Sequence, residues 1–211
     1  SALGMLLAVV ITLLNINTVD FSFIVAGVVV GGVIGGVMAL RIQMTSIPQM
    51  VALLNGFGGG ASLTIALAEY FTKLDVAPAS FADLLTPVVV DSRVFGMGGE
   101  GTVALVAIGL TLLIGAVTLT GSLVAFAKLQ ELMKKSYGLP GGPVGNGLFL
   151  LAALAAVVCM VINPGNVAAV VAVVVLALLL GLFLVMPIGG ADMPVVIALL
   201  NAYSGIAAAL A

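Results

Sequence analysis

The sequence contains no histidine, a single cysteine, Cys159, and few charged residues. Without histidine the chain cannot build a Cys/His metal site or a Ser–His or Cys–His catalytic pair, and one cysteine cannot form a disulfide within the chain. Six basic and eight acidic residues give a net charge of −2, and the basic residues are scattered along the chain. The composition therefore predicts no metal site and no nucleic-acid partner.

Hydrophobic residues, by contrast, make up 63% of the chain, charged residues only 7%, and the mean hydropathy is +1.41. Soluble domains carry roughly 25% charged residues. As a soluble globule, a chain of 211 residues with this composition would leave large apolar patches in water. We therefore expect an integral membrane protein surrounded by the lipid bilayer, with residues 1–211 forming one membrane domain.

Apolar runs bounded by turn residues predict an all-α fold, a polytopic transmembrane helix bundle of about seven helices. Most of these runs approach the ~20 residues that cross a bilayer. The expected spans are residues 2–16, 23–40, 48–71, 102–127, 147–162, 167–186 and 194–211.

The basic residues near the span ends indicate how the chain crosses the membrane. One side would carry Arg41, Lys128, Lys134 and Lys135. By the positive-inside rule this side is cytoplasmic, so we expect a multi-pass protein of the cell (inner) membrane with its basic loops in the cytoplasm. Seven spans then place the end of the chain outside, and a further cytoplasmic domain would need another crossing.

Small and polar residues mark two helix faces. The second span has small-xxx-small spacing, typical of close helix packing in lipid, at Gly27, Gly31, Gly32 and Gly36. The fourth span carries Thr111, Gly115, Thr118 and Ser122 on one face. Packing with interhelical hydrogen bonds is the usual role of such a face, and a hydrated path is the alternative. A third group of glycines, residues 56–60, lies inside a span, where it indicates close packing or local unwinding.

An internal repeat aligns residues 46–59 with residues 192–205 without a gap, matching Pro, Ala-Leu-Leu-Asn and Gly. Each copy opens with a helix-capping side chain, Ser46 or Asp192, two residues before a proline, which is tolerated in the first helical turn. Both copies should therefore begin helices on the same side of the membrane. Asn55 and Asn201 each follow their proline by seven residues, roughly 10 Å along the helix, so two amides are expected at the same depth.

An unpartnered carboxamide in hydrocarbon costs several kcal/mol, so Asn55 and Asn201 are expected to face the bundle interior. Two roles are open: they tie helices together, or they line a proton pathway. Ser62 and Glu69 follow Asn55 at heptad spacing on the same face, which strengthens the second role. Glu69, near the outer end, suits a proton-exchanging carboxylate and equally a solvated helix terminus.

Three ordered motifs resemble the membrane part of the β subunit of proton-translocating NAD(P) transhydrogenase. They are residues 45–55, residues 118–129, and residues 188–196 with 201–205, which include Gly-Gly-Ala-Asp-Met-Pro-Val-Val. The likeness runs through nearly the whole chain. It implies an enzyme that passes hydride from NADH to NADP+ between two soluble nucleotide domains while protons cross the membrane domain. NAD(H) and NADP(H) would bind in those domains and no cofactor in this chain.

The resemblance also implies partners and roles. The partners are an α subunit, the NADP(H)-binding domain of the same β subunit and a homodimer of the α/β unit. The position of Asn55 is histidine in some family members and asparagine in others, and that of Asn201 is polar and linked to proton transfer. Asp192 matches an acidic residue near the face that meets the NADP(H) domain, which we expect to dock near Asp192, Arg41 and Lys128.

The sequence departs from the family pattern in two ways. The family's first span before Ser1, its last span after Ala211 and the NADP(H) domain are not in this chain. With asparagine at position 55 that side chain cannot itself titrate, so we expect a water chain. The side chains proposed to hold it are Asn55, Ser62, Thr118, Ser122 and Asn201.

Two other functions fit the residues alone. One is a secondary transporter whose two Pro-to-Asn helices frame a polar substrate site, although repeats in such folds are often inverted and these are parallel. The other is a structural scaffold subunit.

Overall fold

The computed structural model describes residues 2–15, 21–74, 99–133 and 142–210. These residues form seven α-helices and two short 3-10 helices, and no strand occurs among them. In chain order they are α1 (Ala2–Asn15), α2 (Phe21–Arg41), η1 (Met44–Ser46), α3 (Ile47–Leu74), α4 (Gly99–Leu129), α5 (Pro143–Ile162), α6 (Val167–Val185), η3 (Gly190–Asp192) and α7 (Met193–Leu210). The predicted all-α class and the seven helices are confirmed.

The helix lengths fit a membrane protein. Within the described ranges, six helices, α2 to α7, are long and apolar enough to cross a membrane. The remaining helix, α1, has 14 residues, about 21 Å at 1.5 Å per residue, which is shorter than the ~30 Å hydrocarbon core. The expected bounds agree with the observed ones to within a few residues. The largest difference at a helix start is α5, which begins at Pro143 because proline is favoured in the first helical turn.

Contacts divide the chain into two units, residues 1–44 and 45–211. The first unit contains α1 and α2, and α2 buries none of its residues. A Cβ atom added to Gly27, Gly31, Gly32 or Gly36 would meet no atom within 4 Å. The close packing predicted for these glycines is therefore not made within the first unit.

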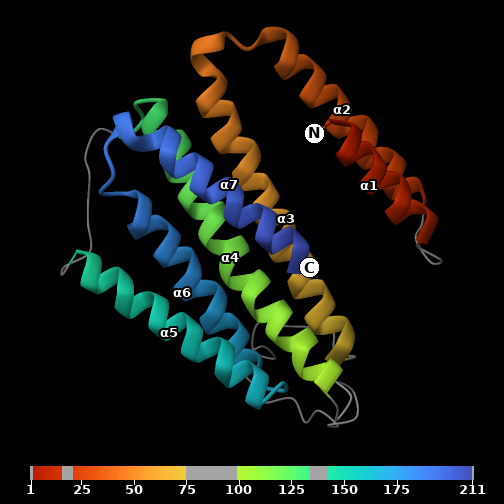
Figure 1. Ribbon diagram of the computed structural model, residues 1–211, viewed down its shortest axis with the longest axis vertical. Coiled ribbons are helices and arrows are strands. Elements are labelled where there is room, and N and C mark those ends of the chain that lie inside the picture. Colours follow the sequence, from red (N-terminus) through yellow and green to blue (C-terminus); the bar gives the residue numbers. More distant parts are fainter. Residues whose placement is uncertain (1, 16–20, 75–98, 134–141, 211) are drawn as a thin grey trace. The chain divides into compact units, whose positions relative to one another are not determined.

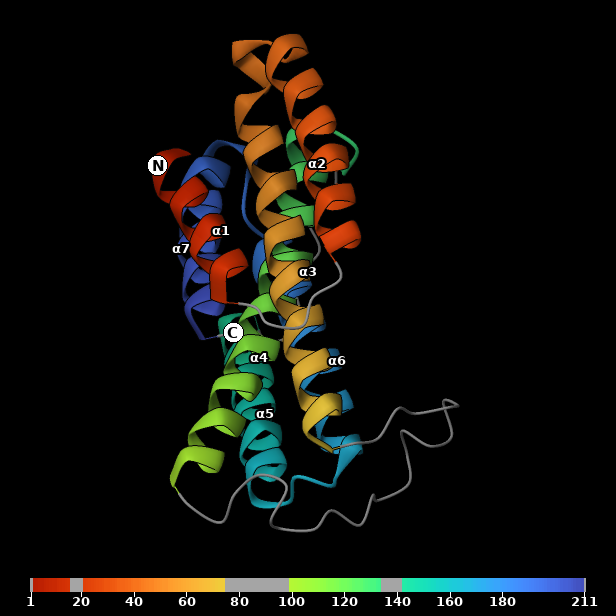
Figure 2. The same cartoon turned by 90° about the vertical axis from the view of Figure 1, so that its right-hand side faces the viewer.

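The second unit is built around α4, which contacts α3, α5, α6 and α7 (Figures 1 and 2). Its helices alternate in direction: α3, α5 and α7 run one way, and α4 and α6 the other. Pro48, Pro143 and Pro194 each lie within the first two residues of α3, α5 and α7. We call this end of the second unit the proline end. The opposite end, where α3 finishes, is the Glu69 end.

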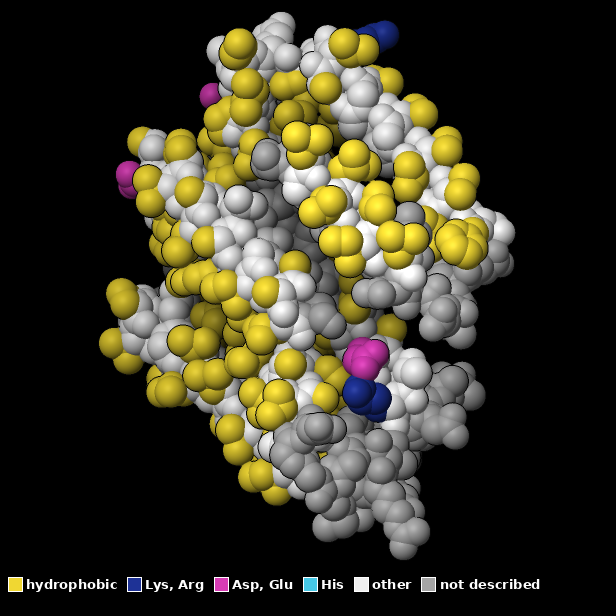
Figure 3. All heavy atoms as spheres, turned by 45° about the vertical axis from the view of Figure 1, so that its right-hand side comes forward, with side chains coloured by type: hydrophobic (Ala, Val, Ile, Leu, Met, Phe, Trp, Pro, Cys, Tyr) yellow, Lys and Arg dark blue, Asp and Glu magenta, His cyan; other side chains and the backbone are white. Residues whose placement is uncertain are grey.

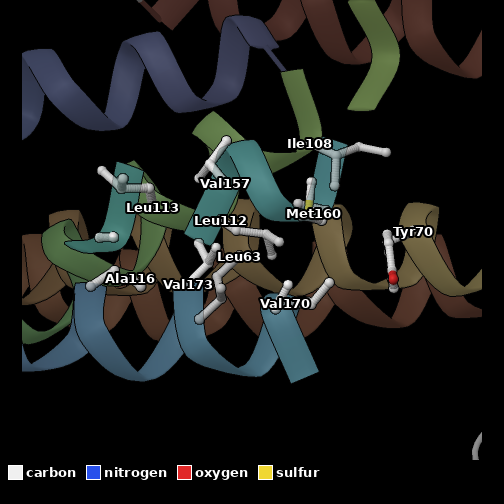
Figure 4. Packing of buried hydrophobic residues seen from close by; sticks show 14 of the residues in the cluster. Leu63, Tyr70, Ile108, Leu112, Leu113, Ala116, Val157, Met160, Val170 and Val173 are labelled. Atoms are coloured by element: carbon white, nitrogen blue, oxygen red, sulfur yellow. The ribbon is translucent and has the colours of Figure 1, made fainter. Parts of the chain in front are cut away.

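Two hydrophobic clusters hold the second unit together. The cluster toward the Glu69 end joins α3, α4, α5 and α6, with Leu63, Leu112, Val157 and Val170 among its members (Figure 4). Its buried Tyr70 donates a hydrogen bond of 2.5 Å to the carbonyl oxygen of Pro164 between α5 and α6. The cluster toward the proline end joins α3, α4, α6 and α7 and includes Ala52, Val124, Val185, Met193 and Leu200. Outside these clusters, many hydrophobic side chains are exposed and few charged ones appear on the face in Figure 3, as a lipid-facing surface requires.

Glycines let the backbones approach closely at two contacts of α4. A Cβ atom on Gly59 would lie 2.8 Å from the carbonyl oxygen of Gly115, and one on Gly115 would lie 2.8 Å from that of Gly59. On another side of α4, a Cβ atom on Gly181 of α6 would lie 2.4 Å from the carbonyl oxygen of Val117. Gly59 therefore serves close packing inside a continuous helix, one of the two roles expected from the sequence.

Candidate functional site

The interface of α3 and α4 buries a polar pair. Nδ2 of Asn55 on α3 donates a hydrogen bond of 3.0 Å to Oγ of Ser122 on α4. Asn55 is 6% exposed and Ser122 is 1% exposed. The prediction that Asn55 faces the bundle interior is confirmed, and its amide bonds to another helix. Because Ser122 Oγ accepts this bond, its own O–H remains able to donate.

Two further polar atoms are buried at the same interface. Oδ1 of Asn55 and Oγ1 of Thr118 have no hydrogen-bond partner among the described residues. Thr118 lies one turn from Ser122 on α4, and its Cβ is 2.9 Å from where a Cβ on Gly59 would stand, one turn from Asn55 on α3. The unpaired atoms thus lie along one helix–helix contact. Each unmet buried polar group costs about 1–3 kcal/mol, so this contact favours a water molecule over hydrocarbon.

Buried polar side chains continue toward the Glu69 end. Ser62 on α3 and Thr111 on α4 are both buried, and Thr111 donates to the carbonyl oxygen of Ala107 in its own helix at 2.8 Å. Glu69 forms an ion pair of 3.2 Å with Lys73, one turn later in α3, and half of its side chain is exposed. A small cavity of about 90 Å³ is lined by Glu69, Lys73 and Thr111. The α3–α4 interface therefore carries polar side chains from Ser122 to Glu69.

The prediction that Asn201 faces the bundle interior is wrong for the described helices. Asn201 is exposed and lines a groove of about 320 Å³ between the first turns of α3 and α7. On α7 it is Ile197 and Leu200 that are buried against the rest of the second unit. Successive helical residues point 100° apart, so burial of Leu200 turns its neighbour Asn201 away from α4. The two amides do not share one buried site.

The proline end holds a second set of polar contacts. Nε2 of Gln49 on α3 donates to the carbonyl oxygen of Leu129 at 3.0 Å, and Nε2 of Gln130 donates to Oε1 of Gln49 at 2.7 Å. Nζ of Lys128 donates to the carbonyl oxygen of Ile188 at 2.7 Å and also to that of Met186. Sequence reasoning placed Lys128 on a docking surface and missed these bonds. The available signal was its place in the last turn of a helix, where lysine often binds free carbonyls.

Of the three residues near which the NADP(H) domain is expected to dock, Asp192 and Arg41 are exposed. Asp192 ends η3 and directly precedes α7, which is the N-cap position. Arg41 ends α2 and belongs to the first unit. Their predicted proximity involves both units and stays a prediction.

The buried part of the site, from Ser122 and Asn55 to Ser62, is polar and uncharged. Among the described residues no group of three or more Cys, Asp or Glu side chains is arranged to hold a metal ion. A cavity of about 660 Å³ between α4, α5, α6 and α7 is lined mainly by apolar side chains, with Asn146 and Tyr203 as its polar members. The buried amide and hydroxyl groups of Asn55, Ser122 and Thr118 can therefore orient water.

Comparisons with known proteins match this chain over its whole length. Residues 1–211 match the family model described as NAD(P) transhydrogenase beta subunit. The NAD(P) transhydrogenase subunit beta of Rhodospirillum rubrum is 35% identical over 210 residues, which are 98% of this chain and 41% of that protein. The same values hold for the subunit from a named strain of that species. The chain thus spans about two fifths of the curated relatives it matches, and it belongs to the NAD(P) transhydrogenase β-subunit family.

Proposed function

We propose that this chain conducts protons across the membrane as the membrane domain of a transhydrogenase, coupled to hydride transfer from NADH to NADP+ in other domains. The observation that carries the proposal is the buried Asn55–Ser122 hydrogen bond, with Asn55 Oδ1 and Thr118 Oγ1 left unpaired beside it. NADP(H) and NAD(H) would bind elsewhere in the assembly. Membership of the β-subunit family supports the coupling to nicotinamide nucleotides.

Water carries the proton in this proposal, because an asparagine side chain does not titrate. Asn55 Oδ1 and Thr118 Oγ1 can accept a hydrogen bond from water, and the hydroxyls of Ser122 and Thr118 can donate one. A water held by such groups replaces hydrogen bonds that the α3–α4 interface lacks. Ser62 extends the polar lining toward Glu69, whose exposed carboxylate would exchange protons with the solvent.

Asn201 belongs to a different wall of the path. Its amide lines an otherwise apolar groove, and leaving it against lipid would cost several kcal/mol. We infer that other membrane segments of the transhydrogenase cover this groove and close the path around Asn201. The partners in this proposal are the α subunit, the NADP(H)-binding domain of the same β subunit near Asp192 and Arg41, and a second copy of the α/β unit.

The test uses the full-length transhydrogenase reconstituted in liposomes. Asn55→Leu removes both amide functions at the buried pair, and we expect it to lower proton pumping during NADH-dependent reduction of NADP+ at least tenfold. The solvent isotope effect on pumping should change with it. Asn163→Leu is the matched control, because Asn163 is exposed at the end of α5, and it should pump at the wild-type rate. Unchanged pumping in Asn55→Leu would count against the proposal.

A secondary transporter remains the alternative, and the groove framed by the first turns of α3 and α7 is the observation in its favour. In that case the groove would hold a polar solute. Uptake of a solute by liposomes without any nicotinamide nucleotide would support this function, and its absence together with nucleotide-driven pumping would exclude it.

A further inference from the structure

Lys128 connects the end of α4 to the segment that leads into α7. Its ammonium donates to the carbonyl oxygens of Met186 and Ile188. Met186 is the C-cap of α6, and Ile188 lies two residues before η3 begins at Gly190. The last carbonyls of a helix have no partner within it, and a lysine can satisfy them. One side chain therefore holds both the end of α6 and the loop after it.

Two residues that follow Lys128 bond to the start of α3: Leu129, which ends α4, and Gln130 after it. The carbonyl oxygen of Leu129 accepts from Gln49, and the amide of Gln130 donates to Gln49. The helix ends here: Glu131 has φ 56°, and the N–H of Leu132 donates to the carbonyl oxygen of Ala127 at 2.9 Å. The last turn of α4 is thus bonded to the starts of both repeat copies, directly to α3 and through the α6–α7 loop to α7.

The contact between α4 and α6 is packed more closely than the loop that follows α6. Oγ1 of Thr120 on α4 donates to the carbonyl oxygen of Leu178 on α6 at 2.8 Å, and Gly181 packs against the backbone of Val117. In the loop, by contrast, a Cβ atom on Gly189 or Gly190 would meet nothing within 4 Å. Met186 belongs to the cluster at the proline end and Ile188 packs against it, whereas the two glycines that follow lie in open space. The Lys128 ammonium adds side-chain hydrogen bonds between α4 and this loop.

We propose that Lys128 is a positioning residue that couples the α6–α7 loop, where Asp192 is expected to meet the NADP(H) domain, to the buried Asn55–Ser122 pair. This inference rests on the proposed function. Lys128 follows Ser122 by six residues on α4, about 9 Å along the helix axis. A displacement of the loop by the docked domain acts on Lys128, and through α4 on Ser122. Without the ammonium, these hydrogen bonds between the loop and α4 are lost.

The first measurement follows the loop itself. Hydrogen–deuterium exchange of residues 187–192 is compared between the wild-type full-length protein and Lys128→Met in lipid nanodiscs. The amides of Ile188 and Asp192, which donate to Val185 and Gly189 carbonyls, should exchange at least threefold faster in the variant. Lys128→Arg keeps several donors and should exchange as the wild type does. Lys73→Met removes the same charge at the Glu69 end and should leave this segment unchanged.

The second measurement follows coupling, which a purely structural bond would not alter. In liposomes, the hydride-transfer rate with an imposed proton gradient is divided by the rate without one. Lys128→Met should lower this ratio at least threefold, and Lys128→Arg should restore it to within twofold of the wild type. If Lys128→Met does not assemble, Lys128→Ala, which likewise carries no side-chain donor, takes its place under the same thresholds.

Three results would overturn the role of Lys128: unchanged loop exchange in Lys128→Met, faster exchange with an unchanged gradient response, or an arginine variant that behaves like methionine. A wild-type protein whose hydride transfer ignores the gradient would instead defeat the proposed function. The two failures are therefore distinguishable, because the first appears only in the Lys128 variants and the second in the wild type.

Discussion

The two copies of the internal repeat, residues 46–59 at the start of α3 and residues 192–205 at the start of α7, have the same helix start and different buried faces. In α3, Ala52 and Asn55 are buried and Leu54 is exposed. In α7, the equivalents of Ala52 and Asn55, which are Ala198 and Asn201, are exposed, while Leu200, the equivalent of Leu54, is buried. The copies are therefore rotated about their axes by roughly one residue, or 100°. A repeat of this kind determines the depth of a side chain and leaves its direction open.

The neighbouring positions of α4 explain the rotation. Against α3 stands Gly115, which lets the backbone of Gly59 approach and brings the asparagine face inward. Against α7 stands Gly121, where a Cβ atom would lie 3.3 Å from the side chain of Leu200. Two facing glycines allow the two backbones to touch, as between α3 and α4. A glycine that faces a leucine leaves room for the leucine side chain, as between α4 and α7. Each copy thus adopts the face that its part of α4 can accommodate.

The largest effect is expected from one added methyl group at Gly59, whose equivalent in the second copy is Gly205. Gly59→Ala would place a Cβ within 3 Å of backbone atoms of Gly115 and Leu119, which cannot yield as a side chain does. We expect a loss of about 3 kcal/mol in the free energy of unfolding. SDS-induced unfolding of the full-length protein in detergent micelles measures it.

The matched control for this prediction is Gly205→Ala, the equivalent position of α7, where a Cβ meets nothing within 4 Å. Alanine has the higher helix propensity, so this variant should gain up to ~1 kcal/mol. Equal losses in the two variants would contradict the difference in packing between the copies.

A second pair of variants tests the leucine positions of the two copies, where the larger loss of stability is expected in α7. Leu200 is 1% exposed and its equivalent Leu54 is 50% exposed. In lipid, removing a buried side chain loses mainly packing, because hydrocarbon replaces the core at little cost. Leu200→Ala should therefore lower the free energy of unfolding by about 2 kcal/mol, and Leu54→Ala by under ~0.5 kcal/mol. The same unfolding assay measures both losses of stability. A larger loss in Leu54→Ala than in Leu200→Ala would contradict the assignment of the buried faces.

Much of the helical architecture was predictable from the sequence. The apolar runs located all seven helices, and Pro48 and Pro194 located the starts of the two repeat copies, because proline is compatible with the first turn only. The inward orientation of Asn55 followed from the cost of an unmet amide in hydrocarbon.

The side of α7 on which Asn201 lies could not be predicted from the sequence. Around α7 nearly every position is apolar, so hydrophobic periodicity does not distinguish the lipid-facing side from the packed side. The opposing residue, Gly121 on α4, leaves the room that the Leu200 side chain occupies. The hydrogen bonds of Lys128 could not be predicted for a related reason, because the carbonyls that accept them lie beside α4 only where α6 ends.

The smallest predicted effect concerns the buried pair itself and uses a double-mutant cycle. Ser122→Ala leaves Nδ2 of Asn55 without its acceptor, which should lower the free energy of unfolding by about 1–2 kcal/mol. In Asn55→Leu the serine loses its partner as well, so the double variant should be more stable than the sum of the two losses by about 1 kcal/mol. The parallel cycle of Ser122→Ala with Asn201→Leu should be additive to within ~0.5 kcal/mol, because Asn201 lies on the groove and makes no bond to the pair. An equal coupling energy in both cycles would mean that the two asparagines act on one site after all, and that the rotation between the repeat copies does not separate them.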